Sequence, residues 1–401
     1  MTTTPHNAPA IPSALDARSH LPPPAIHVPE STAFAFLDGM VRTRSHSGEE
    51  AKVAAYIVGE MKKFGYDSWI DTAGNAVGTR CGAPINGKPY TDIVLMGHID
   101  TVPGDVRIRR DGDLYYGRGS VDAKGPFATF VMGGSVVKLP AGIRLVVIGA
   151  VEEEAASSKG ARQAAKDWKP AMCVIGEPSA WDGVTLGYKG RLLVEYKIKR
   201  PCSHSAGPEP TAAAIAAAWW DSVRIHAEAI GRGRQKSVFD RLQVALREFN
   251  TRSDGLHDYA EMLVSYRIPL WIKPTNIETA CRELAGIEGT LVTQHEDEHT
   301  EVNFIGHEEA FATDRHNALV YAFTAAIREQ KGKPKLRVKT GTADMNVVGP
   351  VWKCPIVAYG PGDSSLDHTP HEHLSIGEYM RAIEVLRSTV QRVADEIARP
   401  A

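Results

Sequence analysis

A histidine and an aspartate follow an apolar run, with His98 and Asp100 directly after residues 93–97. The run predicts a buried strand, and in an open α/β sheet the carboxyl ends of strands hold ligands and catalytic groups. A histidine there can bind a metal ion while a nearby carboxylate fixes its imidazole in one tautomer. By itself the pair is weak evidence for a metal site, because a histidine at a strand end is more often a hydrogen-bonded structural residue.

Further strand ends and one glycine-rich loop carry the same kinds of side chain. Two histidines with several carboxylates suit hydrolytic zinc, since imidazole nitrogen and carboxylate oxygen both bind it at about 2.0–2.2 Å. A catalytic zinc normally takes three protein ligands, so a larger set predicts two ions bridged by one carboxylate. The candidates are His98, Asp122, Glu153 or Glu154, Glu177 and His368.

The order His-x-Asp, Asp, Glu-Glu, Glu, His resembles the dizinc deacylase and exopeptidase family. That family includes acetylornithine deacetylase, succinyl-diaminopimelate desuccinylase and carboxypeptidase G-type enzymes, and the resemblance runs from about Ser31 to the end of the chain. Segments 176–190, 339–346 and 367–370 resemble more narrowly its lysine-biosynthesis branch. Those enzymes release lysine or ornithine from an acetyl group or from an amino-group carrier protein.

The resemblance implies a metal site that holds two zinc ions, for which cobalt can substitute. His98 and Glu177 would bind one ion, Glu154 and His368 the other, and Asp122 would bridge them. It also implies a cis peptide bond at Asp122–Ala123.

The same resemblance gives Asp100 the position behind His98 and makes Glu153 the general base. The family usually shows Asp-Glu-Glu where this chain has three glutamates, so the alignment could shift by one residue. We align the last two glutamates with the base and the ligand because Gly160 then keeps its spacing.

Substrate contacts are expected from three further segments that resemble the family. His204 resembles a lid histidine that reaches into the partner's active site and stabilises the oxyanion; alternatively, it is a loop histidine that caps the next helix. Arg267 resembles a lid arginine that binds a substrate carboxylate, a task suited to a guanidinium, or it forms a surface salt bridge. Thr340, Gly341 and Thr342 resemble a substrate-backbone loop, with a plain turn as the alternative.

The alternation of predicted strands and helices favours an α/β sandwich with a largely parallel sheet. Residues 31–186 and 307–401 are predicted to form this zinc-exopeptidase-like catalytic domain, after an N-terminal extension at 1–30. Residues 187–306 are predicted to form an inserted ferredoxin-like α+β lid, with strand-helix-strand-strand-helix-strand order and a last strand at 289–295. The family uses this lid for dimerisation, so a homodimer is expected.

The composition agrees with a globular cytoplasmic enzyme. A formal net charge of −2 gives no general attraction to nucleic acid. No apolar run approaches the about 18 residues that span a bilayer, and the N-terminus lacks the pattern of a signal peptide. The five cysteines are scattered and form no Cys-x-x-Cys pair, which favours a reducing cytoplasm.

The sequence therefore predicts a metal-dependent amide hydrolase that releases lysine or ornithine from an N-acyl or carrier-linked precursor. A succinyl-diaminopimelate desuccinylase and a dizinc dipeptidase or carboxypeptidase are alternatives, because the zinc chemistry would be the same. An inactive scaffold of the same fold is the remaining alternative, although the full ligand set and Glu153 argue against it.

Overall fold

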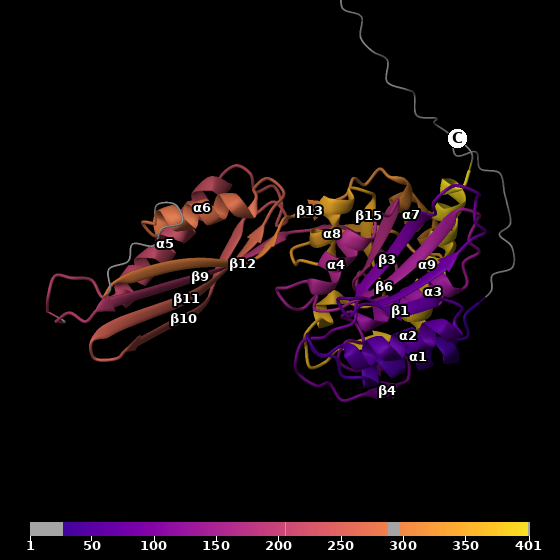
Figure 1. Cartoon of the computed structure of the whole chain (residues 1–401), viewed down its shortest axis with the longest axis horizontal. Helices are drawn as coiled ribbons and strands as arrows, with labels where there is room; N and C mark the ends of the chain where they lie inside the picture. Colours follow the sequence, from indigo (N-terminus) through magenta and orange to yellow (C-terminus); the bar gives the residue numbers. More distant parts are fainter. Residues whose placement is uncertain (1–26, 205, 288–296, 400–401) are drawn as a thin grey trace, which may run out of the picture.

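The computed structural model describes residues 27–204, 206–287 and 297–399. These residues form two bodies joined by two neighbouring chain crossings, with the smaller body inserted into the larger one (Figure 1). Most of the predicted extension at 1–30 and the whole predicted strand at 289–295 lie outside the described residues. No helix in the described segments is long and apolar enough to cross a membrane.

The larger body is built on a nine-stranded mixed sheet. Its order is β1-β2-β6-β3-β7-β15-β8-β13, and β14 pairs with β8 off this path. The strands are β1 (Asp67–Ile70), β2 (Ala76–Cys81), β3 (Thr91–His98), β6 (Ile143–Ala150), β7 (Met172–Gly176), β8 (Gly183–Tyr188), β13 (Phe311–Ala312), β14 (Lys335–Lys339) and β15 (Ile356–Tyr359).

Helices cover both faces of this sheet, as expected for apolar strands with no polar face. Side chains alternate between two cores: Ile93 and Leu95 of β3 join one, and Val94 and Met96 join the other. The first core includes α1 (Glu30–Arg42), α2 (Ala51–Lys63), α3 (Lys124–Ser135), α7 (Ala318–Glu329) and α9 (Ile376–Ile397). The second includes α4 (Lys159–Asp167) and α8 (Asp344–Trp352).

Four adjacent central strands, β6, β3, β7 and β15, run parallel to one another. Their carboxyl ends therefore meet at one edge of the sheet. The strand register places these ends level with one another: His98 pairs with Ala150, and both Gly97 and Tyr359 pair with Gly176. A short 3-10 helix, η1 (Ser364–Leu366), follows β15 at the same edge, and a small sheet of β4 (Arg109–Asp111), β5 (Leu114–Tyr116) and β16 (His373–Ser375) lies apart from it.

The smaller body is a four-stranded antiparallel sheet with order β10-β11-β9-β12. Two helices cover one face, and the strands alternate buried and exposed residues accordingly. The chain leaves the main sheet after Tyr188 and returns to it at Phe311. Its elements are β9 (Gly190–Pro201), α5 (Ala212–Gly231), β10 (Gln243–Ser253), β11 (His257–Ile268), α6 (Pro274–Leu284) and β12 (His299–Glu308).

Candidate metal centre

Asp122 lies between the two predicted histidine ligands. Its Oδ1 is 3.2 Å from Nε2 of His98, and its Oδ2 is 3.0 Å from Nε2 of His368. His98 is the last residue of β3, Asp122 follows the glycine-rich loop before α3, and His368 follows η1. The Asp122–Ala123 peptide bond is cis, as the family resemblance implies. One carboxylate with an imidazole at each oxygen is the arrangement expected of a bridging ligand.

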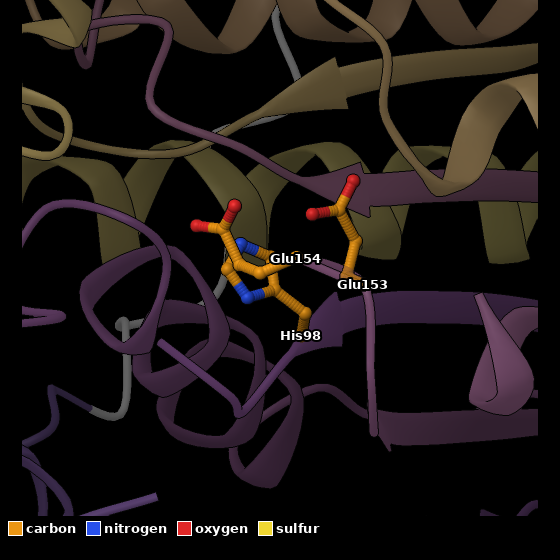
Figure 2. A group of neighbouring side chains, drawn as sticks. All are labelled: His98, Glu153 and Glu154. Carbon is orange, nitrogen blue, oxygen red and sulfur yellow. The ribbon is translucent and has the colours of Figure 1, made fainter. Parts of the chain in front are cut away.

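Glu154 completes the close cluster. Its Oε1 is 2.8 Å from Nε2 of His368. Ligand atoms of His98, Glu153 and Glu154 lie within 4.8 Å of one another, and so do those of Asp122, Glu154 and His368. Figure 2 shows the Glu153 and Glu154 carboxylates beside the imidazole of His98. The two groups share Glu154, so both histidines and these carboxylates form one continuous cluster.

A cavity of about 590 Å³ opens over this cluster. Glu177 lines it together with Asp122, although Glu177 is not among the residues of the two close groups. Four of the predicted ligands, Asp122, Glu154, Glu177 and His368, line this cavity, and the buried His98 contacts Asp122. Glu153, rather than Glu177, belongs to the close group of His98. The cavity wall also contains Tyr188, Arg191, Arg267, Val338, Lys339, Thr340, Gly341, Thr342, Ser364 and Asp367.

Asp100 is fully buried and fixes the positions of several neighbours at once. Its carboxylate is 3.4 Å from Nδ1 of His98 and accepts hydrogen bonds from the backbone N–H groups of Glu153 and Glu154, at 3.1 and 3.0 Å. The Ser47 hydroxyl donates to the same carboxylate at 2.6 Å. One side chain therefore ties the end of β3 to the segment after β6.

Two residues of this support were missed by sequence reasoning. Ser47 binds Asp100, and the buried Glu50 carboxylate accepts hydrogen bonds from the backbone of Gly48 and of Glu152. Both residues precede α2, where polar residues are the usual composition of a helix start. Their sequence therefore gave no sign that they support a site about 50 to 100 positions further along.

The register of the three glutamates can be compared with their geometry. The Glu152 side chain turns away from the cavity, accepting a hydrogen bond from Ser157 and lying 3.4 Å from Lys159. The Glu152 backbone is in the left-handed region, with φ of +56°. Glu153 and Glu154 both line the cavity, so the alignment that makes Glu153 the base is compatible with the structure.

The electrostatics of the cluster indicate that it is built for cations. Burial raises the pKa of Glu153 and of Glu177 well above the ordinary range, and each is raised further by neighbouring carboxylates. Burial opposes protonation of His98, yet hydrogen bonds to Asp100 and Asp122 raise its pKa well above the usual value. Buried carboxylates crowded in this way are stabilised by divalent ions, so the donor set fits the two zinc ions that the sequence predicts.

The wall opposite the cluster comes partly from the smaller body. Nη1 of Arg267, on β11, donates to the Thr342 hydroxyl at 3.3 Å, so the predicted arginine meets the predicted loop. Thr340 and Gly341 line the same cavity. Arg191, at the start of β9, also lines it and was not anticipated from the sequence.

His204 is not among the residues that line the cavity. It follows β9 at the end opposite Arg191, and ten residues of strand span about 33 Å. It is exposed, and its Nδ1 accepts a hydrogen bond from the backbone N–H of Ala206. Within one chain, then, the predicted lid histidine stays far from the metal ligands.

The cavity and its ligand set can be compared with known proteins. Residues 94–392 match the family model described as peptidase family M20/M25/M40. The chain belongs to this family. The predicted α/β fold class and the predicted metallohydrolase class are thereby confirmed.

Relatives of known name lie within the same family. A LysW-lysine hydrolase of Deinococcus radiodurans is 43% identical over 355 residues, which cover 87% of this chain and 93% of that protein. A LysW-lysine/LysW-ornithine hydrolase of Sulfurisphaera tokodaii is 30% identical over 309 residues, covering 74% of this chain and 81% of that one. The resemblance to the lysine-biosynthesis branch is confirmed by these relatives.

Solved structures share the fold at low identity. An M20 family metallo-carboxypeptidase from Sulfolobus solfataricus superposes with a TM-score of 0.70 at 16% identity, covering 91% of this chain and 99% of that one. A dinuclear metal-binding peptidase of the same family from Bacillus subtilis gives 0.63 at 12% identity, covering 92% and 99%. These likenesses establish the architecture of the M20/M25/M40 chain described here.

Proposed function

We propose that this M20/M25/M40 chain hydrolyses the amide that links lysine or ornithine to a carrier protein. The observation that carries the proposal is the position of Asp122 between His98 and His368, at the edge of a cavity that the other predicted ligands also line. The substrate follows from the relatives, which are named for LysW-linked lysine and ornithine and align over most of the chain.

The metal ligands in this proposal are His98, Asp122, Glu154, Glu177 and His368. Zinc is the ion we propose, with cobalt as a substitute, because imidazole and carboxylate are ligands that zinc prefers. When bound, two such ions lower the pKa of water toward neutrality and polarise an amide carbonyl.

The protein's own part in the reaction begins with Glu153. Its carboxylate would accept a proton from the attacking water and deliver it to the departing amine. For this task the pKa of Glu153 must lie above that of an ordinary glutamate. Burial supplies such a shift. Asp100 would act through His98 and through the backbone of Glu153, holding both in place.

We further propose that the smaller body, predicted at 187–306, is a lid and dimerisation domain. Because His204 lies at the end of β9 far from its own cavity, we propose that it stabilises an oxyanion in the cavity of a second copy. Such a donor acts electrostatically on charge that develops in the transition state. We also propose a cytoplasmic location, in keeping with five free cysteines.

A substrate panel with metal analysis tests this function. The purified protein, loaded with zinc or cobalt, is assayed against carrier-linked lysine, Nα-acetyl-lysine, Nα-acetyl-ornithine, succinyl-diaminopimelate and simple dipeptides. We expect release of lysine from the carrier-linked and acetylated forms and about two metal ions per chain. Cleavage of dipeptides alone would contradict the biosynthetic function, and activity without bound metal would contradict the mechanism.

A further inference from the structure

Two arginines face each other on neighbouring strands of the smaller body. Arg191 of β9 and Arg267 of β11 are direct partners in the antiparallel register, so they lie on the same face of the sheet. Directly opposite residues have Cβ atoms about 4.5–5.5 Å apart, and like charges in this relation destabilise a sheet. Both arginines line the cavity above the metal ligands. A repulsive pair at a cavity wall calls for an anion.

Glu308, the carboxylate paired with Arg191, compensates only part of the charge of the two arginines. Glu308 of β12 is the partner of Arg191 on the other side, and its Oε2 is 3.3 Å from Nε of Arg191. Glu308 is buried and is shared with Arg162 of α4, at 3.1 Å. Among the described residues, no salt bridge involves Arg267. At least one positive charge is therefore left facing the cavity.

The hydrogen bonds of the two guanidinium groups leave donors unused. Arg191 donates through Nε to Glu308, and neither of its terminal nitrogens donates to any group in the described part of the chain. Arg267 donates only through Nη1, to Thr342, again among the residues described. Gly306 makes room for the contact between Arg191 and Glu308, since a Cβ at position 306 would lie 3.0 Å from Oε2 of Glu308 and 3.2 Å from Nε of Arg191. Both side chains are thus anchored, with free donors toward the cavity.

The resemblance already implies that Arg267 binds a substrate carboxylate; we infer that Arg191 joins it in a clamp for this one group, the carboxylate of the amino acid which the reaction releases. Two guanidinium groups can grip a carboxylate in fixed, planar geometry, which an ammonium cannot do. Glu308 orients Arg191 and balances one charge, and the carboxylate balances the other. This inference rests on the proposed function and adds Arg191 as a residue that determines specificity for an acylated amino acid with a free carboxylate.

The test compares two substrates that differ only in this group, Nα-acetyl-lysine and Nα-acetyl-lysinamide, with the zinc-loaded enzyme. We expect the wild type to prefer the carboxylate by about 100-fold in kcat/KM, because a site built around a charged group rejects an analogue without it. In Arg191→Gln and in Arg267→Gln the preference should fall below about tenfold, and the double variant should lose little more than either single variant. Arg191→Lys, which keeps the charge without the planar fork, should recover only part of the preference.

A matched control comes from Glu308's other partner. Arg162→Gln removes the guanidinium that does not line the cavity, and it should keep the full preference. Calorimetry with lysine and lysinamide as ligands measures the same discrimination without turnover, and thermal unfolding checks that each variant is folded.

The outcomes separate the clamp from the function. Equal cleavage of the two substrates by the wild type would overturn the clamp while supporting the proposed hydrolase. Strictly additive losses in the double variant, or an unchanged preference in Arg191→Gln, would also overturn it. Hydrolysis of neither substrate, nor of carrier-linked lysine, would overturn the proposed function itself.

Discussion

The two walls of the cavity are constructed in different ways. The metal edge, by which we mean the sheet edge with the proposed metal ligands, belongs to one body. There four parallel strands bring their carboxyl ends together and Asp100 accepts hydrogen bonds from the backbone of Glu153 and Glu154. The opposite wall comes from the inserted sheet, where Arg191 and Arg267 are held by one ion pair and one side-chain hydrogen bond. Backbone register thus positions the proposed reacting groups, whereas the proposed substrate contacts are held by side chains, with Arg191 bonded inside the smaller body and Arg267 bonded across to the larger one.

This difference indicates that catalysis and substrate specificity depend on separate parts of the molecule and can therefore vary independently. Groups held by strand register move only if the sheet moves, which suits the preorganisation that catalysis requires. Groups that bridge two bodies can shift when one body moves relative to the other, as lids that close over substrates do. We therefore expect substitutions at the metal edge to affect turnover itself, and those at the lid to affect which substrate is accepted.

The largest expected effect lies at the metal edge, where Glu153→Gln removes the proposed base while keeping its shape. We expect turnover to fall at least about a thousandfold, within the range of general acid–base catalysis. Metal content should stay near that of the wild type, since Glu153 is not a proposed ligand. Steady-state kinetics and metal analysis of the purified variant measure both.

Glu152→Gln is the matched control for this prediction. Its side chain is bonded to Ser157 and faces away from the cavity, so we expect activity within a few fold of the wild type. If Glu152→Gln were the inactive variant, the register of the three glutamates would be wrong by one residue, and the base would have to be reassigned.

The same contrast explains what could be predicted from the sequence. Residues such as His98 and Glu177 follow apolar strands, and strand ends at one sheet edge converge, so the candidate metal ligands could be predicted from local patterns. In the inserted body the predicted strand-helix-strand-strand-helix order agrees with β9, α5, β10, β11 and α6, whereas the last strand predicted at 289–295 lies outside the described residues. Arg191, Ser47 and Glu50 could not be found in this way. Their roles depend on cross-strand register or on a contact between distant segments, and neither leaves a local pattern.

A second, smaller effect is expected at the tip of the inserted sheet, with His204→Ala. If His204 supplies an oxyanion donor to a second copy, its loss should lower turnover by about 100- to 1,000-fold, as for other such donors. Mixing this variant with Glu153→Gln under subunit exchange should restore activity. One cavity of each mixed dimer would contain both residues, so about a quarter of wild-type activity is expected in a two-fold dimer.

The complementation depends on the dimer, which sedimentation or light scattering measures in the same samples. A monomer in solution with full activity would contradict the role of His204 in a partner. A dimer in which the mixture stays inactive would instead show that His204 acts within its own chain, after a movement of the lid. An active monomer would remove the difference that we draw between the two walls. An inactive mixed dimer would support it, because the lid would then have to move.

The smallest effect we predict tests whether the metal edge owes its rigidity to Asp100. Asp100→Asn keeps the shape but replaces one carboxylate oxygen by an amide, so it cannot accept from all of its donors. We expect a loss of about 10- to 100-fold in metal affinity or activity, typical of residues behind a ligand. Ser47→Ala, which removes one donor and leaves the carboxylate, should lose less than Asp100→Asn. Should Ser47→Ala be the more damaging variant, the segment before α2, rather than Asp100, would hold the edge in place.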